Sequence, residues 1–195
     1  MYKRQAINRK SVNIAGTRQY DGTTNIAAAD ISTITDTVNS EVLSMSGGLG
    51  TTSSANVAAY NLVNTSQGTL TLANGPSGAN QGLASNYTLT GGTQDYTITQ
   101  RVLNSSGSKT YDANTDALAG AITLSNLVSG EALNHSGTAT IGSANAGSYT
   151  ITNLSGISIA DGSGGTASNY TLTGGTHNFT VNRRAVSVSG TRLYD

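Results

Sequence analysis

The residue stretch best suited to chemistry is a short acidic segment near the middle of the chain. Asp112, Asn114 and Asp116 place oxygen ligands at alternating positions, as a calcium-binding loop does. A calcium loop also has glycine at its sixth position and glutamate at its twelfth, where this chain has Ala117 and Thr123. The pattern therefore favours a turn rich in Asp and Asn. We expect no cofactor, with calcium at these three residues as the alternative.

The two histidines are the other candidates for acid–base or metal chemistry. His135 and His177 lie in the second of two similar halves of the chain, and Met45 and Gln94 occupy the equivalent positions in the first. A catalytic base or metal ligand should recur in equivalent units, and no set of nucleophile, base and orienting residue does so. We therefore predict that the chain is not an enzyme.

The similarity of the two halves reflects an internal repeat. Residues 84–93 and 167–176 are the same ten letters, ASNYTLTGGT, 83 positions apart. The stretch 10–21 likewise corresponds to 101–112 and again to 184–195. This spacing predicts repeated structural units.

The repeat divides the chain into four parts. Residues 1–9 are expected to be the tail strand of a preceding repeat, 10–100 the first β repeat, 101–183 the second, and 184–195 the first strand of a following one. The junctions lack the Gly and Ser composition of a flexible linker. We therefore expect neighbouring repeats to pack end to end in an elongated rod.

Within each repeat the apolar residues alternate with Ser and Thr, which is the signature of half-buried strands. Two Gly-Gly pairs, within 90–93 and 173–176, predict tight hairpin turns, and 23–37 is the place where a short helical turn is expected. The predicted fold is all-β: small antiparallel sandwiches of the Ig-like type, with a β-grasp-like fold as the alternative.

Composition excludes several classes of partner. Ten Lys and Arg residues balance ten Asp and Glu residues, so no net charge would attract nucleic acid. The chain has no run of 18 apolar residues, and we expect no membrane insertion of this segment. It also has no cysteine, so it can form neither disulfides nor thiolate metal sites.

The recurring Tyr-Asp motif resembles the YDG-type repeats, which are related to MBG-type repeats. The resemblance rests on the YDGTT stretch at 20–24, the NYTLT stretches and the basic residues at each junction. Such repeats occur in large bacterial surface adhesins, including filamentous-haemagglutinin-like proteins exported by two-partner secretion. The resemblance implies an extracellular protein anchored to the bacterial cell surface. The motif residues that we expect to be structural are Tyr20, Asp21, Gly22, Tyr87, Tyr111, Asp112, Tyr170, Tyr194 and Asp195.

These observations favour a mechanical function. The repeats are expected to form a stalk or spacer that projects a distal binding region, with neighbouring repeats of the same chain as partners. The alternative is a weak multivalent module that binds glycan or exopolysaccharide through the loops at 74–83 and 160–166. A glycan or a host surface is also a candidate partner, reached through the parent protein. Those two loops differ in sequence and length, which disfavours a shared ligand.

Overall fold

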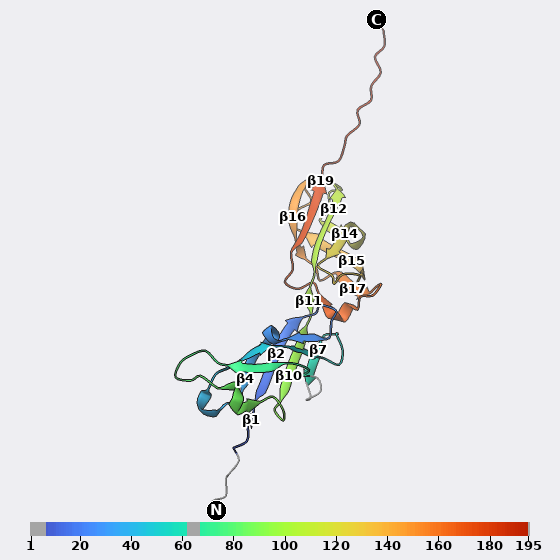
Figure 1. The fold of residues 1–195 in the computed structure, drawn as a ribbon. Helices are drawn as coiled ribbons and strands as arrows, with labels where there is room; N and C mark the ends of the chain where they lie inside the picture. The colour runs from blue at the N-terminus through green and yellow to red at the C-terminus, as the bar shows by residue number, and fades with distance from the viewer. Residues whose placement is uncertain (1–6, 62–66, 195) are drawn as a thin grey trace, which may run out of the picture. The chain divides into compact units, whose positions relative to one another are not determined.

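The computed structural model describes residues 7–61 and 67–194, and in this part of the chain the fold is all-β (Figure 1). The described helical segments are single 3-10 turns of three residues each. None of them is long and apolar enough to span a membrane. The turn expected within 23–37 is η1 (Ala28–Asp30). The other described turns are η2 (Val38–Ser40), η3 (Ala84–Asn86), η4 (Ala119–Ala121) and η5 (Ala167–Asn169).

The chain divides into two compact units, residues 1–100 (unit 1) and 101–195 (unit 2). Unit 1 contains a four-stranded sheet in the order β4-β2-β10-β7 and three two-stranded sheets, β1-β9, β3-β6 and β5-β8. Its strands are β1 (Lys10–Ser11), β2 (Asn13–Gln19), β3 (Asn25–Ala27), β4 (Ile31–Thr35), β5 (Leu43–Gly47), β6 (Leu49–Thr51), β7 (Ala58–Asn61), β8 (Thr71–Asn74), β9 (Tyr87–Thr88) and β10 (Gln94–Thr99).

Unit 2 is built around one larger sheet that is nearly closed, like a barrel. Six strands follow the order β13-β15-β16-β19-β12-β14, β17 pairs with β15, and β11 pairs separately with β18. The strands are β11 (Arg101–Val102), β12 (Asn104–Thr110), β13 (Asp116–Leu118), β14 (Ile122–Ser125), β15 (Leu133–Ile141), β16 (Gly147–Asn153), β17 (Ile157–Asp161), β18 (Tyr170–Thr171) and β19 (His177–Asn182).

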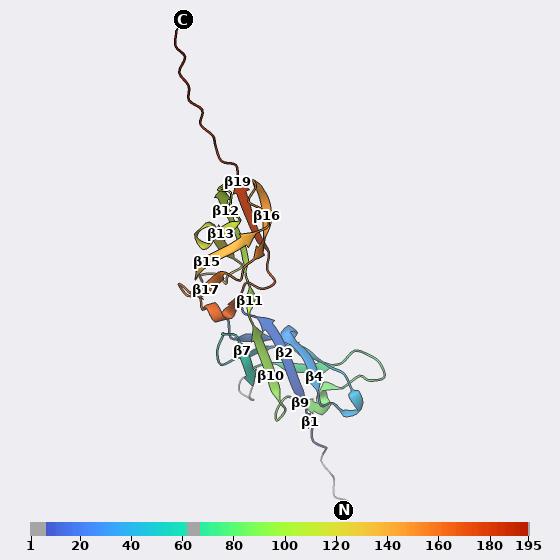
Figure 2. The same cartoon turned by 180° about the vertical axis from the view of Figure 1, so that it is seen from behind.

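The first long strand and the last strand of each unit lie side by side and run in the same direction. In unit 1, β10 pairs with β2 in parallel over six residues, from Gln94↔Ile14 to Thr99↔Gln19 (Figure 2). In unit 2, β19 pairs with β12 over six residues in the same way. The short pairs β1-β9 and β11-β18 extend these parallel ladders. The all-β prediction is confirmed, but the sheets are mixed, so the expectation of antiparallel pairing is wrong for these four pairs.

The predicted hairpins at 90–93 and 173–176 are also wrong. In unit 1, β9 pairs with β1 and β10 pairs with β2, so the strands on either side of the Gly-Gly pair follow the same neighbouring segment instead of pairing with each other. The glycines instead lie in a short loop between β9 and β10, which we call the Gly-Gly excursion. A hydrogen bond from the Gly92 N–H to Leu89 O closes this loop. The excursion re-aligns the chain with its parallel partner.

The alternating pattern of the sequence places apolar and aromatic side chains inside each unit. In unit 2 the core combines residues of the large sheet, including Ile141, Phe179 and Val181, all at most 2 % exposed. In unit 1, Tyr96 and Ile98 of β10 are buried against the same unit's other strands. Thr, Ser and Asn occupy most of the intervening outward positions, as the period-two pattern predicts.

Candidate functional site

The recurring Tyr-Asp motif follows β2 in unit 1 and β12 in unit 2, and in each unit it folds around a basic side chain. In unit 2, the Lys109 ammonium lies 2.9 Å from Asp112 Oδ1. It also donates to Asn114 O at 2.9 Å, to Asn114 Oδ1 at 2.6 Å and to Asp116 O at 2.8 Å. Only 12 % of the Lys109 side chain is exposed. We call residues 109–116 the Lys109 loop.

The equivalent loop of unit 1, residues 18–23, is arranged around a guanidinium and is called the Arg18 loop. Arg18 pairs with the Asp21 carboxylate and donates to Thr23 O. Asp21 Oδ1 also accepts hydrogen bonds from the Thr23 N–H and the Thr23 hydroxyl, each at 2.9 Å. Burial raises the pKa of Asp21, but the hydrogen bonds from Thr23 and the Arg18 charge outweigh it and hold the pKa below its ordinary value.

Asp112 is held in its ionised form in the same manner. The hydrogen bond from Lys109 lowers the pKa of Asp112, and a hydrogen bond from the Asn114 N–H adds to the effect. Asp112 and Asp21 are therefore each the counter-ion of a basic side chain in their own loop, and each also caps a backbone N–H as an Asx-turn does.

The three calcium candidates are brought together by the Lys109 loop, but around the protein's own cation. Asp112 and Asn114 direct side-chain oxygens at the Lys109 ammonium, whereas Asp116 contributes only its main-chain carbonyl. A metal ion would have to displace this ammonium to use the same oxygens. Among residues 7–61 and 67–194, no group of three His, Cys, Asp or Glu side chains lies close enough to hold a metal.

The two loops share a turn conformation despite different residues. Gly22 has φ 79°, and Ala113 at the equivalent position has φ 66°. The left-handed region is readily accessible to glycine and costs other residues roughly 1–2 kcal/mol. Unit 2 therefore makes the same turn at the expense of a strained alanine.

Both histidines make structural hydrogen bonds. His177 Nε2 lies 2.8 Å from Leu172 O and Nδ1 lies 2.9 Å from Ser105 Oγ, while in unit 1 Gln94 Nε2 donates to Leu89 O at 2.8 Å. His177 and Gln94 thus hold the equivalent Gly-Gly excursions. His135 Nε2 lies 3.1 Å from Ala119 O and 2.9 Å from Ile122 O.

A hydrogen-bonded network around a buried tyrosine recurs in both units. Tyr87 donates to Glu41 Oε2 and accepts from the Val38 N–H at 3.1 Å. Tyr170 donates to Glu131 Oε2 at 2.7 Å and accepts from the Val128 N–H at 3.0 Å. Burial raises the pKa of both hydroxyls. The sequence prediction missed both glutamates, although the recurrence of Glu-x-Leu at 41–43 and 131–133 could have revealed them.

The other motif tyrosines differ in environment. Tyr20 is buried, at 5 % exposure, whereas Tyr111 is 37 % exposed and Tyr194 is fully exposed. Asp195 lies outside the described residues. Among the described residues, the predicted motif therefore comprises one Tyr-Asp loop and one Tyr–Glu network in each unit.

Comparison with known families identifies a YDG domain at residues 93–178, which covers most of unit 2. The match begins just before β10 and ends inside β19. No curated protein gives a significant match to the chain. No solved structure does so either.

Proposed function

We propose that this chain is a stalk or spacer segment of a bacterial cell-surface adhesin, in which the units project a distal binding region. The observation that carries the proposal is the parallel pairing of the first long strand with the last strand in each unit. Because β2 and β10 run in the same direction, the chain enters unit 1 at one end and leaves it at the other. Unit 2 has the same property through β12 and β19.

The use of polar residues supports a structural role rather than a catalytic one. The ionised and hydrogen-bonding side chains of the Lys109 loop, the Arg18 loop and the Tyr–Glu networks are engaged with the protein's own backbone and side chains. The connection between the units is also short, since β10 ends at Thr99 and β11 begins at Arg101. Tension would pass from one unit to the next through a single intervening residue.

The proposal can be tested by replacing the units within the parent protein. An unrelated rod of equal length should preserve adhesion, whereas deletion without replacement should reduce it. Loss of adhesion with the equal-length rod would overturn the stalk function. A parallel assay measures binding of this chain to glycans, exopolysaccharides and matrix proteins, with and without calcium. Saturable binding abolished by changes in the 74–83 loop would instead make the units adhesive.

A further inference from the structure

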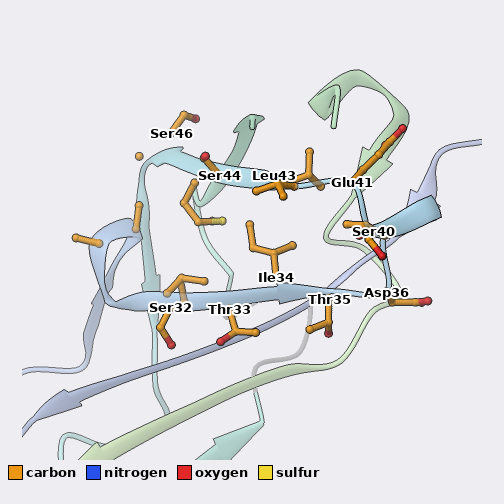
Figure 3. Close-up of a pocket in the computed structure, with 17 residues that line it drawn as sticks. Ser32, Thr33, Ile34, Thr35, Asp36, Ser40, Glu41, Leu43, Ser44 and Ser46 are labelled. Atoms are coloured by element: carbon orange, nitrogen blue, oxygen red, sulfur yellow. The ribbon is translucent and has the colours of Figure 1, made fainter. Parts of the chain in front are cut away.

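Unit 1 contains a groove of about 940 Å³ between β4 and β5 (Figure 3). Its apolar lining includes Ile34, Leu43 and Met45, and most of its remaining wall is serine and threonine. Figure 3 shows Ile34 rising from β4 towards β5. The groove thus has an apolar interior and walls that carry hydroxyl groups.

The two strands that line the groove, β4 and β5, each lie at the edge of their own sheet. β4 pairs with β2 on one side, and β5 pairs with β8 on one side; within the described residues neither strand has a second partner. In an antiparallel pair alternate residues direct their N–H and C=O groups to the partner, so the others direct theirs away from it. An edge strand of this kind is a template for an additional strand.

The equivalent region of unit 2 is bridged by a histidine. His135 on β15 reaches the carbonyls of Ala119 and Ile122, which connects β15 with the segment leading into β14. In unit 1 the equivalent residue is Met45, whose thioether has no N–H to donate. The groove of unit 1 therefore lies where unit 2 is linked internally.

One end of the groove carries excess negative charge. Asp36 and Glu41 are lining residues, and none of the lining residues is basic. Lys10 pairs with Asp36 at 2.7 Å, while Glu41 accepts the Tyr87 hydroxyl. The carboxylates of Asp36 and Glu41 and the ammonium of Lys10 together carry one net negative charge. This charge would attract a basic residue at this end of a bound segment.

We propose that the groove binds an extended peptide segment of a partner protein, with a Lys or Arg residue beside Glu41 and alternating small apolar residues along Ile34 and Leu43. The segment adds a strand to β4, β5 or both. Because β4 is five residues long, the groove accommodates about five residues, or roughly 17 Å of extended chain. Main-chain hydrogen bonds supply the affinity and the alternate side chains supply the selectivity.

The test uses the whole chain with methyl-labelled Ile, Leu and Met residues and a capped peptide of one arginine followed by alternating valine and threonine. Titration should shift the signals of Ile34, Leu43 and Met45 in a saturable manner. The signals of Ile122 and Leu133 should stay in place and serve as the matched control from unit 2. Absence of saturable shifts, or equal shifts in both units, would overturn the proposal.

Two further samples separate strand addition from adhesion to an apolar surface. A peptide methylated at alternate backbone nitrogens keeps its side chains but loses main-chain donors, and its affinity should fall at least tenfold. Met45→His introduces the bridge of unit 2 and should weaken binding of the unmodified peptide at least tenfold, with the circular dichroism spectrum unchanged. Undiminished binding in either sample would contradict the proposal.

Discussion

At the residue scale, the turn of the Tyr-Asp motif offers a direct test of backbone strain. Ala113 adopts the left-handed conformation that Gly22 adopts in unit 1. We predict that Ala113→Gly stabilises unit 2 by about 1 kcal/mol, because glycine removes the conformational cost, although the added flexibility of the unfolded chain offsets part of the gain. Urea denaturation followed by the amide signals of unit 2 measures the change.

The reciprocal variant is the control. Gly22→Ala should destabilise unit 1 by about 1 kcal/mol and leave the unit 2 signals unaffected. If Ala113→Gly destabilised unit 2, the left-handed turn would not be a source of strain.

The charge of the Lys109 loop predicts how the pKa of Asp112 responds to substitution. Lys109 lowers this pKa, so the ionised carboxylate stabilises the folded state above the unfolded pKa of about 3.9, and this stabilisation is lost as pH falls through the folded pKa. In Lys109→Met the pKa of Asp112 should rise towards its ordinary value. Carboxyl ¹³C titration measures it.

Asp21 is the internal reference for that titration, because Arg18 remains in place. Its pKa should be the same in both proteins. An unchanged pKa for Asp112 in Lys109→Met would show that the backbone N–H of Asn114 alone holds the carboxylate ionised.

The site was partly predictable at this scale. Recurrence in both halves marked the tyrosines and the Asp of the motif, because residues that serve the same packing role are retained at the same spacing. The sequence, which places Lys109 just before Asp112 and Arg18 just before Asp21, predicts an ion pair in each loop, and the structure confirms both pairs. The contacts of Lys109 with the carbonyls of Asn114 and Asp116 could not be predicted, since ammonium and calcium ions both use oxygen ligands. Only the geometry shows that the side chain folds back onto its own loop.

At the scale of elements, the Gly-Gly excursion depends on close backbone approach. A Cβ atom at Gly175 would lie 1.9 Å from Leu103 O, whereas one at Gly174 would meet nothing within 4 Å. We predict that Gly175→Ala destabilises unit 2 by about 3 kcal/mol or more, since the β11-β12 segment must move away.

Gly174→Ala is the matched control. Gly174 has φ 89°, so alanine there should cost only about 1–2 kcal/mol of conformational energy. Urea denaturation of both variants checks the order. If the two variants lost the same free energy of unfolding, the glycine pair would be required by the left-handed backbone at Gly174 and not by the close approach of Gly175 to Leu103 O.

The Gly-Gly pair in each unit also explains why a hairpin was predicted from the sequence. Two glycines between alternating segments favour a tight turn, and local sequence does not specify which distant segment each flanking strand will pair with. The period-two pattern determined the all-β class because burial alternates in any strand. The parallel pairing depends on contacts about 80 residues apart, such as Gln94 with Ile14, which local patterns do not encode.

At the scale of the whole molecule, the parallel ladders determine how each unit resists force. When unit 1 is pulled from the start of β2 and the end of β10, the hydrogen bonds between these strands are loaded together, in shear. When it is pulled from the C-terminal ends of β2 and β10, which lie side by side, the hydrogen bonds between the two strands are loaded one after another. A unit that transmits tension along a stalk should therefore be strongest along its own chain direction.

Single-molecule force spectroscopy can compare these two directions in the same protein. Because the chain has no cysteine, handles can be attached at introduced pairs: Arg9→Cys with Gln100→Cys for shear, and Thr24→Cys with Gln100→Cys for peeling. We predict a clearly higher rupture force for the first pair at equal pulling speed. Forced unfolding depends on the barrier to unfolding and not on equilibrium stability, so equal denaturation midpoints with unequal rupture forces would identify β2-β10 as the element that bears the load. Equal rupture forces would remove the mechanical advantage on which the stalk proposal depends.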